Sequence, residues 1–173
     1  MNAEQARLLV DYFANLWEGE LPATTKVLRS VPDERRDYRP DGKSRTAWEL
    51  ATHVALGDLW FIQSIIDRRF AFDAEKEKQQ AARFKNAGDV ADFYAREVPA
   101  KLKELRALPA EQLTEVVDFF GMMRQPNVAY LGLANNHSIH HRGQLTSYLR
   151  ACGSKVPAIY GASADETPMP TAS

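Results

Sequence analysis

The segment Asn135–Gln144, with the sequence NNHSIHHRGQ, contains three of the four histidines of this 173-residue chain. It lies in a stretch bounded by Pro126 and Gly153 that contains no other proline. Proline is favoured in the first turn of a helix, and glycine is favoured just after the last turn. The sequence therefore predicts one long helix between these two residues.

The helical phase of this segment separates the three histidines. With successive residues about 100° apart around the axis, His137 and His141 fall within an apolar stripe and His140 falls at its margin. The stripe comprises Tyr130, Leu131, Leu133, Ala134, Leu145 and Tyr148. We therefore expect His137 and His141 to face the interior and His140 to face away from it.

Two histidines four residues apart on a helix can bind one metal ion, because their side chains project from adjacent turns. The fourth histidine, His53, lies in another apolar helical segment, so three inward imidazoles are available. Three protein ligands leave a coordination position open, as in catalytic zinc sites. The alternative is three core histidines with ordinary hydrogen-bond partners, and spacing alone does not separate the two interpretations.

Composition indicates one globular domain, residues 1–173, that is long enough to bury a core. The formal net charge of −1 argues against nucleic acid as a partner, although it does not exclude a small basic patch. The single cysteine, Cys152, allows no internal disulfide and is typical of the reducing cytoplasm. We find no secretion signal and no apolar run of about 18 residues, so we expect no membrane partner.

Apolar periodicity predicts two helices in the first part of the chain. The first covers residues 3–29, and we expect a kink or short break at Pro22. The second begins at Thr46, which can form a capping box with Glu49 three residues later. Residues 48–66 are apolar on nearly every side, so this helix should lie in the core.

A third predicted helix starts with Asp89 as its cap and should bend at Pro99. Residues 70–88, which precede it, are charged, and we expect a loop with about one exposed helical turn. Residues 114–120 are rich in β-branched and aromatic side chains and favour a short strand or extended strap. The tail from about residue 166 should fray.

The four predicted helices, with histidines on the second and fourth, resemble the DinB superfamily (the DinB/YfiT-like proteins). The match is strongest in His137–Arg150, which reads HSIHHRGQLTSYLR, and in the run Gly153–Pro157 that follows. Trp48–His53, with the sequence WELATH, resembles the histidine signature of the family's second helix. The resemblance extends from about Ala3 to Asp165 and is weak in residues 67–120.

This resemblance implies an antiparallel four-helix bundle with an unusual connection between the second and third helices. It also implies a divalent ion, whether zinc, nickel, iron or manganese, held by His53, His137 and His141. No DNA binding is implied. Several relatives in the superfamily use low-molecular-weight thiols, as S-transferases or isomerases. A two-fold homodimer is also implied, and the apolar residues of the first helix, including Tyr12 and Trp17, exceed what one bundle contact needs.

The resulting functional prediction is a divalent-metal-binding enzyme, a thiol-dependent S-transferase or isomerase. A metal-dependent hydrolase and a non-catalytic metal- or ligand-binding bundle are the alternatives. Cys152 lies eleven residues after His141, about 16 Å along the helix, so any thiol must come from a cosubstrate. Gln144 can orient a histidine or a bound water, or can tie two helices together. Arg142 should form a surface or interhelical salt bridge, and no catalytic residue is assigned.

Overall fold

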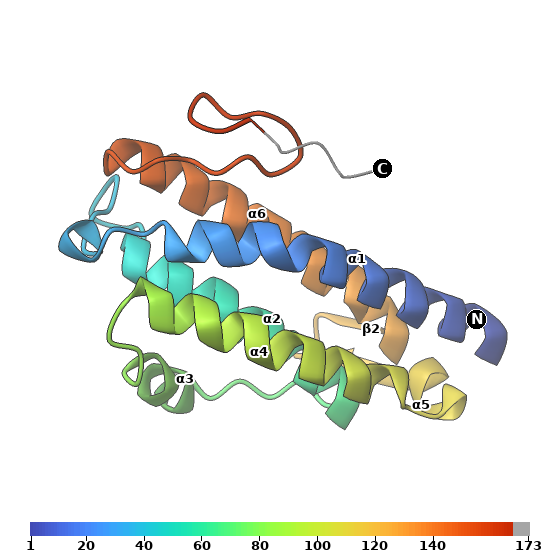
Figure 1. Ribbon diagram of the computed structural model, residues 1–173. Coiled ribbons are helices and arrows are strands. Elements are labelled where there is room, and N and C mark those ends of the chain that lie inside the picture. The colour runs from blue at the N-terminus through green and yellow to red at the C-terminus, as the bar shows by residue number, and fades with distance from the viewer. Residues whose placement is uncertain (168–173) are drawn as a thin grey trace.

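The computed structural model describes residues 1–167, and four long helices packed side by side account for most of it (Figure 1). They are α1 (Ala3–Arg29), α2 (Ala47–Asp67), α4 (Ala87–Arg106) and α6 (Tyr130–Ala151). Helices α1 and α2 each pack against both α4 and α6. The predicted all-α bundle is therefore confirmed, with a small two-stranded sheet at one end.

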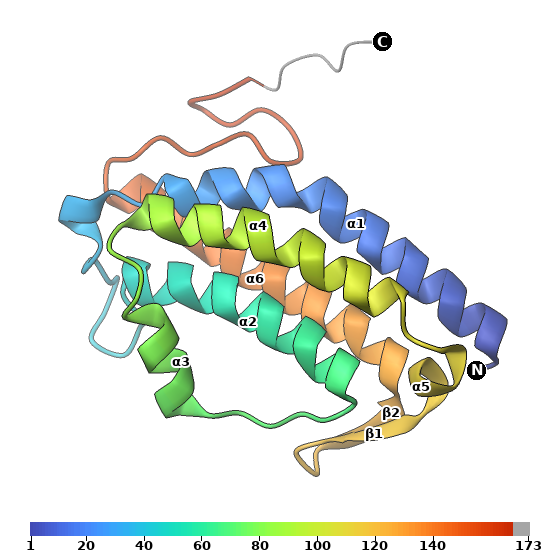
Figure 2. The ribbon, with the colours of Figure 1, turned by 60° about the horizontal axis from the view of Figure 1, so that its bottom comes forward.

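The direction of the helices explains the connection that the resemblance implied. Helix α4 runs in the same direction as α2, while α1 and α6 run in the opposite direction (Figure 2). The chain must therefore return along the bundle between α2 and α4. It does so through an outer segment that contains the short helix α3 (Ala74–Ala81), which is longer than the single turn expected.

Local hydrogen bonds determine where these helices begin. The capping box predicted for α2 is confirmed, since Glu49 N–H donates to Thr46 Oγ1 at 3.0 Å and Thr46 N–H donates to Glu49 Oε2 at 2.7 Å. The predicted cap of α4 is wrong: Asn86 is the N-cap, and its side chain accepts from the N–H of Asp89. The Asp89 carboxylate accepts from the Lys85 N–H, which fixes the preceding turn instead.

The prolines within helices cause no break. Helix α1 continues through Pro22, which is exposed, and α4 continues through Pro99. Each proline removes one backbone hydrogen bond, and the packing of long helices against each other can offset that loss. Of the two alternatives expected at Pro22, a kink or a short break, the short break is therefore wrong.

The strand predicted within residues 114–120 is confirmed as β1 (Val116–Phe119). Its partner β2 (Met123–Pro126), which we did not predict, pairs antiparallel with it. Helix α5 (Ala110–Thr114) precedes the hairpin, and a 3₁₀ turn, η2 (Asn127–Ala129), follows it. Pro126 thus ends a strand rather than starting a helix, and α6 begins only at Tyr130.

The segment after α6 returns along α1 and is fixed to the bundle by polar contacts. Arg142 of α6 is buried and forms an ion pair with Glu20 of α1 at 2.5 Å. Of the surface and interhelical salt bridges predicted for Arg142, the interhelical one is therefore present. The Arg142 guanidinium also donates to the hydroxyl of Tyr160. Glu166 pairs with Lys26. The tail expected to fray, from about residue 166, consists mainly of residues 168–173, which lie outside the described residues.

Within residues 1–167, no helix combines the length and the apolar character that crossing a membrane requires.

Candidate metal centre

The bundle brings together the three histidines selected from the sequence. His53 lies on α2, and His137 and His141 lie one turn apart on α6, which packs against α2. One potential ligand nitrogen from each residue lies within 4.8 Å of the other two. The Nε2 atoms of His53 and His137 are 3.0 Å apart. His140, expected to face away, is exposed.

Gly57 makes room for this arrangement. A Cβ atom added at Gly57 of α2 would lie 2.9 Å from Cε1 of His137 on α6. Real side chains do not approach so closely, so any larger residue would displace the His137 ring. The structure shows that the space accommodates the ring from the opposite helix.

The Nδ1 atom of each histidine faces an oxygen from a different part of the chain. His141 Nδ1 lies 2.7 Å from Gln144 Oε1, His53 Nδ1 lies 3.6 Å from Glu77 Oε1, and His137 Nδ1 lies 3.8 Å from Asp58 Oδ1. An acceptor at Nδ1 favours the tautomer with the proton there, which leaves the Nε2 lone pair free. Of the three residues that supply these oxygens, only Gln144 was predicted from the sequence to orient a histidine.

Asp58 was missed by the sequence reasoning. Its side chain is fully buried, and its Oδ2 atom accepts hydrogen bonds from Tyr94 Oη at 2.8 Å and Ser138 Oγ at 2.7 Å. Its Oδ1 atom and His137 Nδ1 are both buried, and within the described chain neither has a hydrogen-bond partner. A signal was present, because Asp58 is the one acid between Leu50 and Ile66 of an otherwise apolar helix.

Glu77 was missed for a different reason. It lies on α3, in the segment predicted to be mostly loop, and no periodicity pointed to the histidines. Partial burial raises the pKa of the Glu77 carboxyl above its usual value, while the nearby charges of Arg45 and His137 act in the opposite direction. Its side chain keeps an exposed fraction of 28%, whereas that of Asp58 keeps none.

The electrostatic environment keeps two of the imidazoles neutral at pH 7. The pKa of His53 is lowered to about 3, mainly by burial and to a smaller extent by the positive charges of Arg45, His137 and His141. Burial also lowers the pKa of His141, although the hydrogen bond that His141 donates to the Gln144 oxygen opposes this shift. Neutral imidazoles are the form that binds metal ions.

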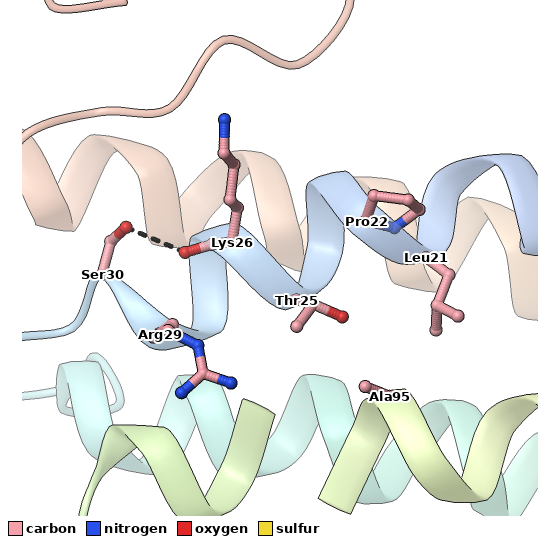
Figure 3. A pocket seen from close by; sticks show the side chains of 7 residues that line it. All are labelled: Leu21, Pro22, Thr25, Lys26, Arg29, Ser30 and Ala95. Atoms are coloured by element: carbon pink, nitrogen blue, oxygen red, sulfur yellow. Dashed lines mark hydrogen bonds between the residues drawn. The ribbon is translucent and has the colours of Figure 1, made fainter. Parts of the chain in front are cut away.

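A cavity of about 470 Å³ opens beside His53. Its walls come from residues 39–45, from the first turns of α2 and from α3. A second hollow of about 400 Å³ lies between α1 and α4 near Pro22 and Ala95, and no histidine lines it (Figure 3). The two cations at its edge, Lys26 and Arg29, already pair with Glu166 and Asp92. The cavity beside His53 is therefore the better candidate for a substrate-binding site.

Comparison with known proteins assigns the chain to a family. The sequence model of the DinB family matches residues 2–170. The chain belongs to the DinB family. The resemblance seen in the two histidine segments is therefore confirmed over nearly the whole chain.

Relatives within the DinB family support the same assignment. The uncharacterised protein YrdA of Bacillus subtilis is 31% identical over 158 residues, which is 91% of each chain. The uncharacterised protein YjoA of the same organism is 25% identical over 130 residues, covering 75% of this chain and 82% of YjoA.

Two crystal structures show the same fold. A DinB-like protein from Bacillus cereus has a TM-score of 0.69 at 28% identity, with 86% of this chain and 95% of the other covered. The DinB-like protein YjoA from Bacillus subtilis has a TM-score of 0.64 at 22% identity, with coverages of 88% and 97%. The DinB fold thus accounts for the meeting of α2 and α6 that assembles the histidines.

The donor set of this DinB-family chain fits a divalent ion. Three imidazole nitrogens converge, and two of them face each other at 3.0 Å, where neutral rings can direct lone pairs at a shared ion. The unpartnered Asp58 and His137 atoms also fit, since a ligating histidine usually donates its other N–H to a carboxylate or carbonyl. His53, His137 and His141 could therefore hold a metal ion.

Proposed function

We propose that this DinB-family protein binds one divalent metal ion through His53, His137 and His141, and that it is a thiol-dependent S-transferase or isomerase. The observation that carries the metal site is the convergence of three imidazoles whose outer nitrogens each face an oxygen. The open cavity beside His53 supports catalysis over a structural role, because a structural metal site is closed to substrate.

A divalent ion held by three neutral imidazoles keeps its positive charge and supplies Lewis-acid chemistry, which lowers the pKa of a thiol or water beside it. The chain's own residues orient the ligands. The Gln144 side-chain oxygen lies within hydrogen-bond distance of His141 Nδ1, and the Asp58 and Glu77 carboxylates face Nδ1 of His137 and His53 at longer distances. Phe61 packs against the His137 ring with 5.1 Å between the ring centroids. An oxygen that faces Nδ1 favours the tautomer with the proton there and leaves Nε2 free to bind an ion.

The location of the one cysteine supports a thiol cosubstrate. Cys152 follows the last residue of α6, and its Sγ lies 3.9 Å from the carbonyl oxygen of Arg35. Burial raises the pKa of the Cys152 thiol, although Arg35 opposes this shift, so it is a poor nucleophile. A thiolate at the histidine cluster must therefore come from a small molecule.

Metal analysis of tag-free protein tests the site directly. We expect about one divalent ion per chain, greatly reduced occupancy when His53, His137 or His141 is replaced by alanine, and little change in His140→Ala. Equal losses from all four substitutions would contradict the assigned ligand set. His140 is a close control, because it lies on the same helix and is exposed.

The reaction class needs a separate experiment. Addition of cysteine or another low-molecular-weight thiol to cobalt-substituted protein should change the visible spectrum, and the change should saturate. If no thiol changed the spectrum of the cobalt-loaded protein, the proposed thiol-dependent transferase and isomerase reactions would be excluded. Metal-dependent hydrolysis, which uses the same ligands and needs only water, would then be the candidate to assay with ester and amide substrates.

We also propose that the protein forms a homodimer. Leu8 and Tyr12 on α1 are exposed at 63% and 61%, and both are apolar or aromatic side chains that a second copy could cover. Light scattering at micromolar concentration should give about twice the chain mass of 19.5 kDa. A mass of one chain over the accessible concentration range would rule the dimer out.

A further inference from the structure

The cavity beside His53 is lined by an excess of cations. Arg39, Lys43 and Arg45 contribute from the loop before α2, and Lys78 contributes from α3 on the opposite wall. The whole chain has a formal net charge of −1, so four cations around one cavity represent a local concentration. The small basic patch that composition could not exclude lies at the entrance to the histidine cluster.

These four cations outnumber the two carboxylates that line the cavity, Glu49 and Glu77. Within residues 1–167, none of the four cationic side chains takes part in an ion pair. Each of these two carboxylates also faces a partner other than the four cations. Glu49 accepts the N–H of Thr46 in the capping box, and Glu77 faces Nδ1 of His53. Positive charge is therefore available to a ligand.

A third carboxylate lies close by, but its own loop uses it. Asp41 accepts hydrogen bonds from the backbone N–H groups of Lys43 and Ser44 and from the Ser44 hydroxyl. These hydrogen bonds lower the pKa of Asp41 below its usual value. They also stabilise the loop conformation that holds Lys43 and Arg45 at the cavity wall.

Arg45 is the cation that connects the cavity to the histidines. Its positive charge contributes to the lowered pKa of both His53 and His141, and it opposes the raised pKa of Glu77. The Arg45 guanidinium is therefore close enough to influence the protonation of His53, His141 and Glu77. A planar guanidinium is also well suited to bind a carboxylate or phosphate with two hydrogen bonds.

We propose that the substrate of the histidine cluster carries an anionic group, a carboxylate or a phosphate, which binds in this cavity between Arg45 and Lys43 on one wall and Lys78 on the other. Occupying the cavity places the rest of the molecule against His53 at its inner wall. This inference rests on the proposed function for the identity of the reacting site. The binding of the anion itself depends only on the cavity residues.

The first experiment uses metal-free protein and two probes of equal shape. Succinate is titrated at constant ionic strength while amide chemical shifts are followed by NMR, and neutral succinamide is titrated in parallel. We expect saturable shifts in residues 39–53 and 74–81 for succinate alone. Inorganic phosphate, titrated in the same way, separates a preference for phosphate from a preference for carboxylate.

A double substitution, Lys43→Gln with Arg45→Gln, should weaken succinate binding at least tenfold. The matched control is Arg83→Gln with Lys85→Gln, which removes the same charge from two exposed residues that do not line the cavity. The control should bind succinate as the unmodified protein does. Equal weakening in both variants, or equal binding of succinamide, would overturn the proposal.

The second experiment places the anion relative to the histidines. In cobalt-loaded protein, a succinate bound in the cavity should show strong paramagnetic broadening of its methylene signals, and the Lys43/Arg45 double variant should lose it. Saturable binding without broadening in a fully loaded sample would overturn the substrate assignment. If cobalt does not bind to the three histidines, the proposed function fails, while the titration of metal-free protein still decides whether the cavity binds anions.

Discussion

Two carboxyl groups face the histidine cluster from opposite sides, and they differ in almost every other respect. Asp58 faces His137 at 3.8 Å from inside the bundle, has no exposed surface, and accepts hydrogen bonds from Tyr94 and Ser138. Glu77 faces His53 at 3.6 Å from the outer helix α3 and has an exposed fraction of 28%.

This difference indicates a division of roles between the two sides. On the inner side, packing and two hydroxyl donors hold Asp58 in one position, so His137 is oriented before any ligand binds. On the outer side, Glu77 is not held by comparable hydrogen bonds and lies next to the cavity that opens to solvent. We therefore expect substitutions on the inner side to change both stability and metal affinity, and those on the outer side to act mainly on the entering ligand.

The largest effect should come from Asp58. In Asp58→Ala, the hydroxyls of Tyr94 and Ser138 lose their buried acceptor, and each loss costs about 1–3 kcal/mol. Asp58→Asn keeps an oxygen for the hydroxyls but can present an N–H to His137 Nδ1, which favours the wrong tautomer. Metal affinity should then fall about 10- to 100-fold. Urea denaturation and metal competition titrations measure the two quantities.

Tyr94→Phe is the control that separates these effects. It removes one hydroxyl donor from Asp58 without altering the oxygen that faces His137. The free energy of unfolding should fall by about 1 kcal/mol while metal affinity stays nearly unchanged. If Tyr94→Phe lowered metal affinity as much as Asp58→Asn does, Asp58 would act only by supporting the fold.

A pH effect follows from the histidines. The pKa of His53 is lowered to about 3 by burial, and burial lowers that of His141 as well, whereas an unfolded chain has histidine pKa values of about 6.5. Between these values the unfolded chain binds more protons. The free energy of unfolding of metal-free protein should therefore be fully retained above about pH 6.5 and fall below it, by up to about 1.4 kcal/mol per pH unit for one histidine.

Denaturation of chelator-treated protein at several pH values between 7.5 and 4.5 measures this slope. His53→Gln should reduce it, because glutamine does not titrate. An unchanged slope in His53→Gln would show that His53 is not the residue whose protonation destabilises the fold.

Gly57 tests whether the inner side tolerates any change in shape. Alanine in a helix interior is ordinarily more favourable than glycine by about 1 kcal/mol. At Gly57 the new Cβ would lie 2.9 Å from His137, so we expect metal affinity to fall about tenfold even where the helix is stabilised. Gly143→Ala on α6 is the matched control, since its Cβ would meet nothing within 4 Å. Metal competition titrations that gave equal affinities for both variants would contradict the steric role.

The sequence predicted the histidines of the inner side, although not Asp58, and it did not predict the contacts of the outer side. Helical phase alone directed His137 and His141 inward and His140 outward, because a long amphipathic helix in a bundle has one buried face. The capping box at Thr46 could also be predicted from the sequence, because it depends on two side chains three residues apart. These features are local, so the sequence contains them directly.

The outer side depends on contacts between distant segments. Glu77 reaches His53 because the connection between α2 and α4 returns along the bundle, and nothing in residues 70–88 encodes that path by periodicity. The strand β2 was missed for a related reason, since Pro126 has similar local preferences at the end of a strand and at the start of a helix. Asp58 was overlooked although its position in an apolar helix was visible.

The smallest effect should come from Glu77→Gln, the outer counterpart of Asp58→Asn. Glutamine is close in shape to glutamate and can still place its amide oxygen towards His53 Nδ1 from a side chain that water also reaches. We therefore expect stability to change by less than about 0.5 kcal/mol and metal affinity by about threefold or less. The same substitution removes a negative charge from the cavity, so succinate should bind more tightly to Glu77→Gln than to the unmodified protein. Metal competition and succinate titrations on one sample measure both changes. A loss of metal affinity as large as that of Asp58→Asn would show that the exposed carboxylate orients its histidine as firmly as the buried one, and the division between the two sides would not hold.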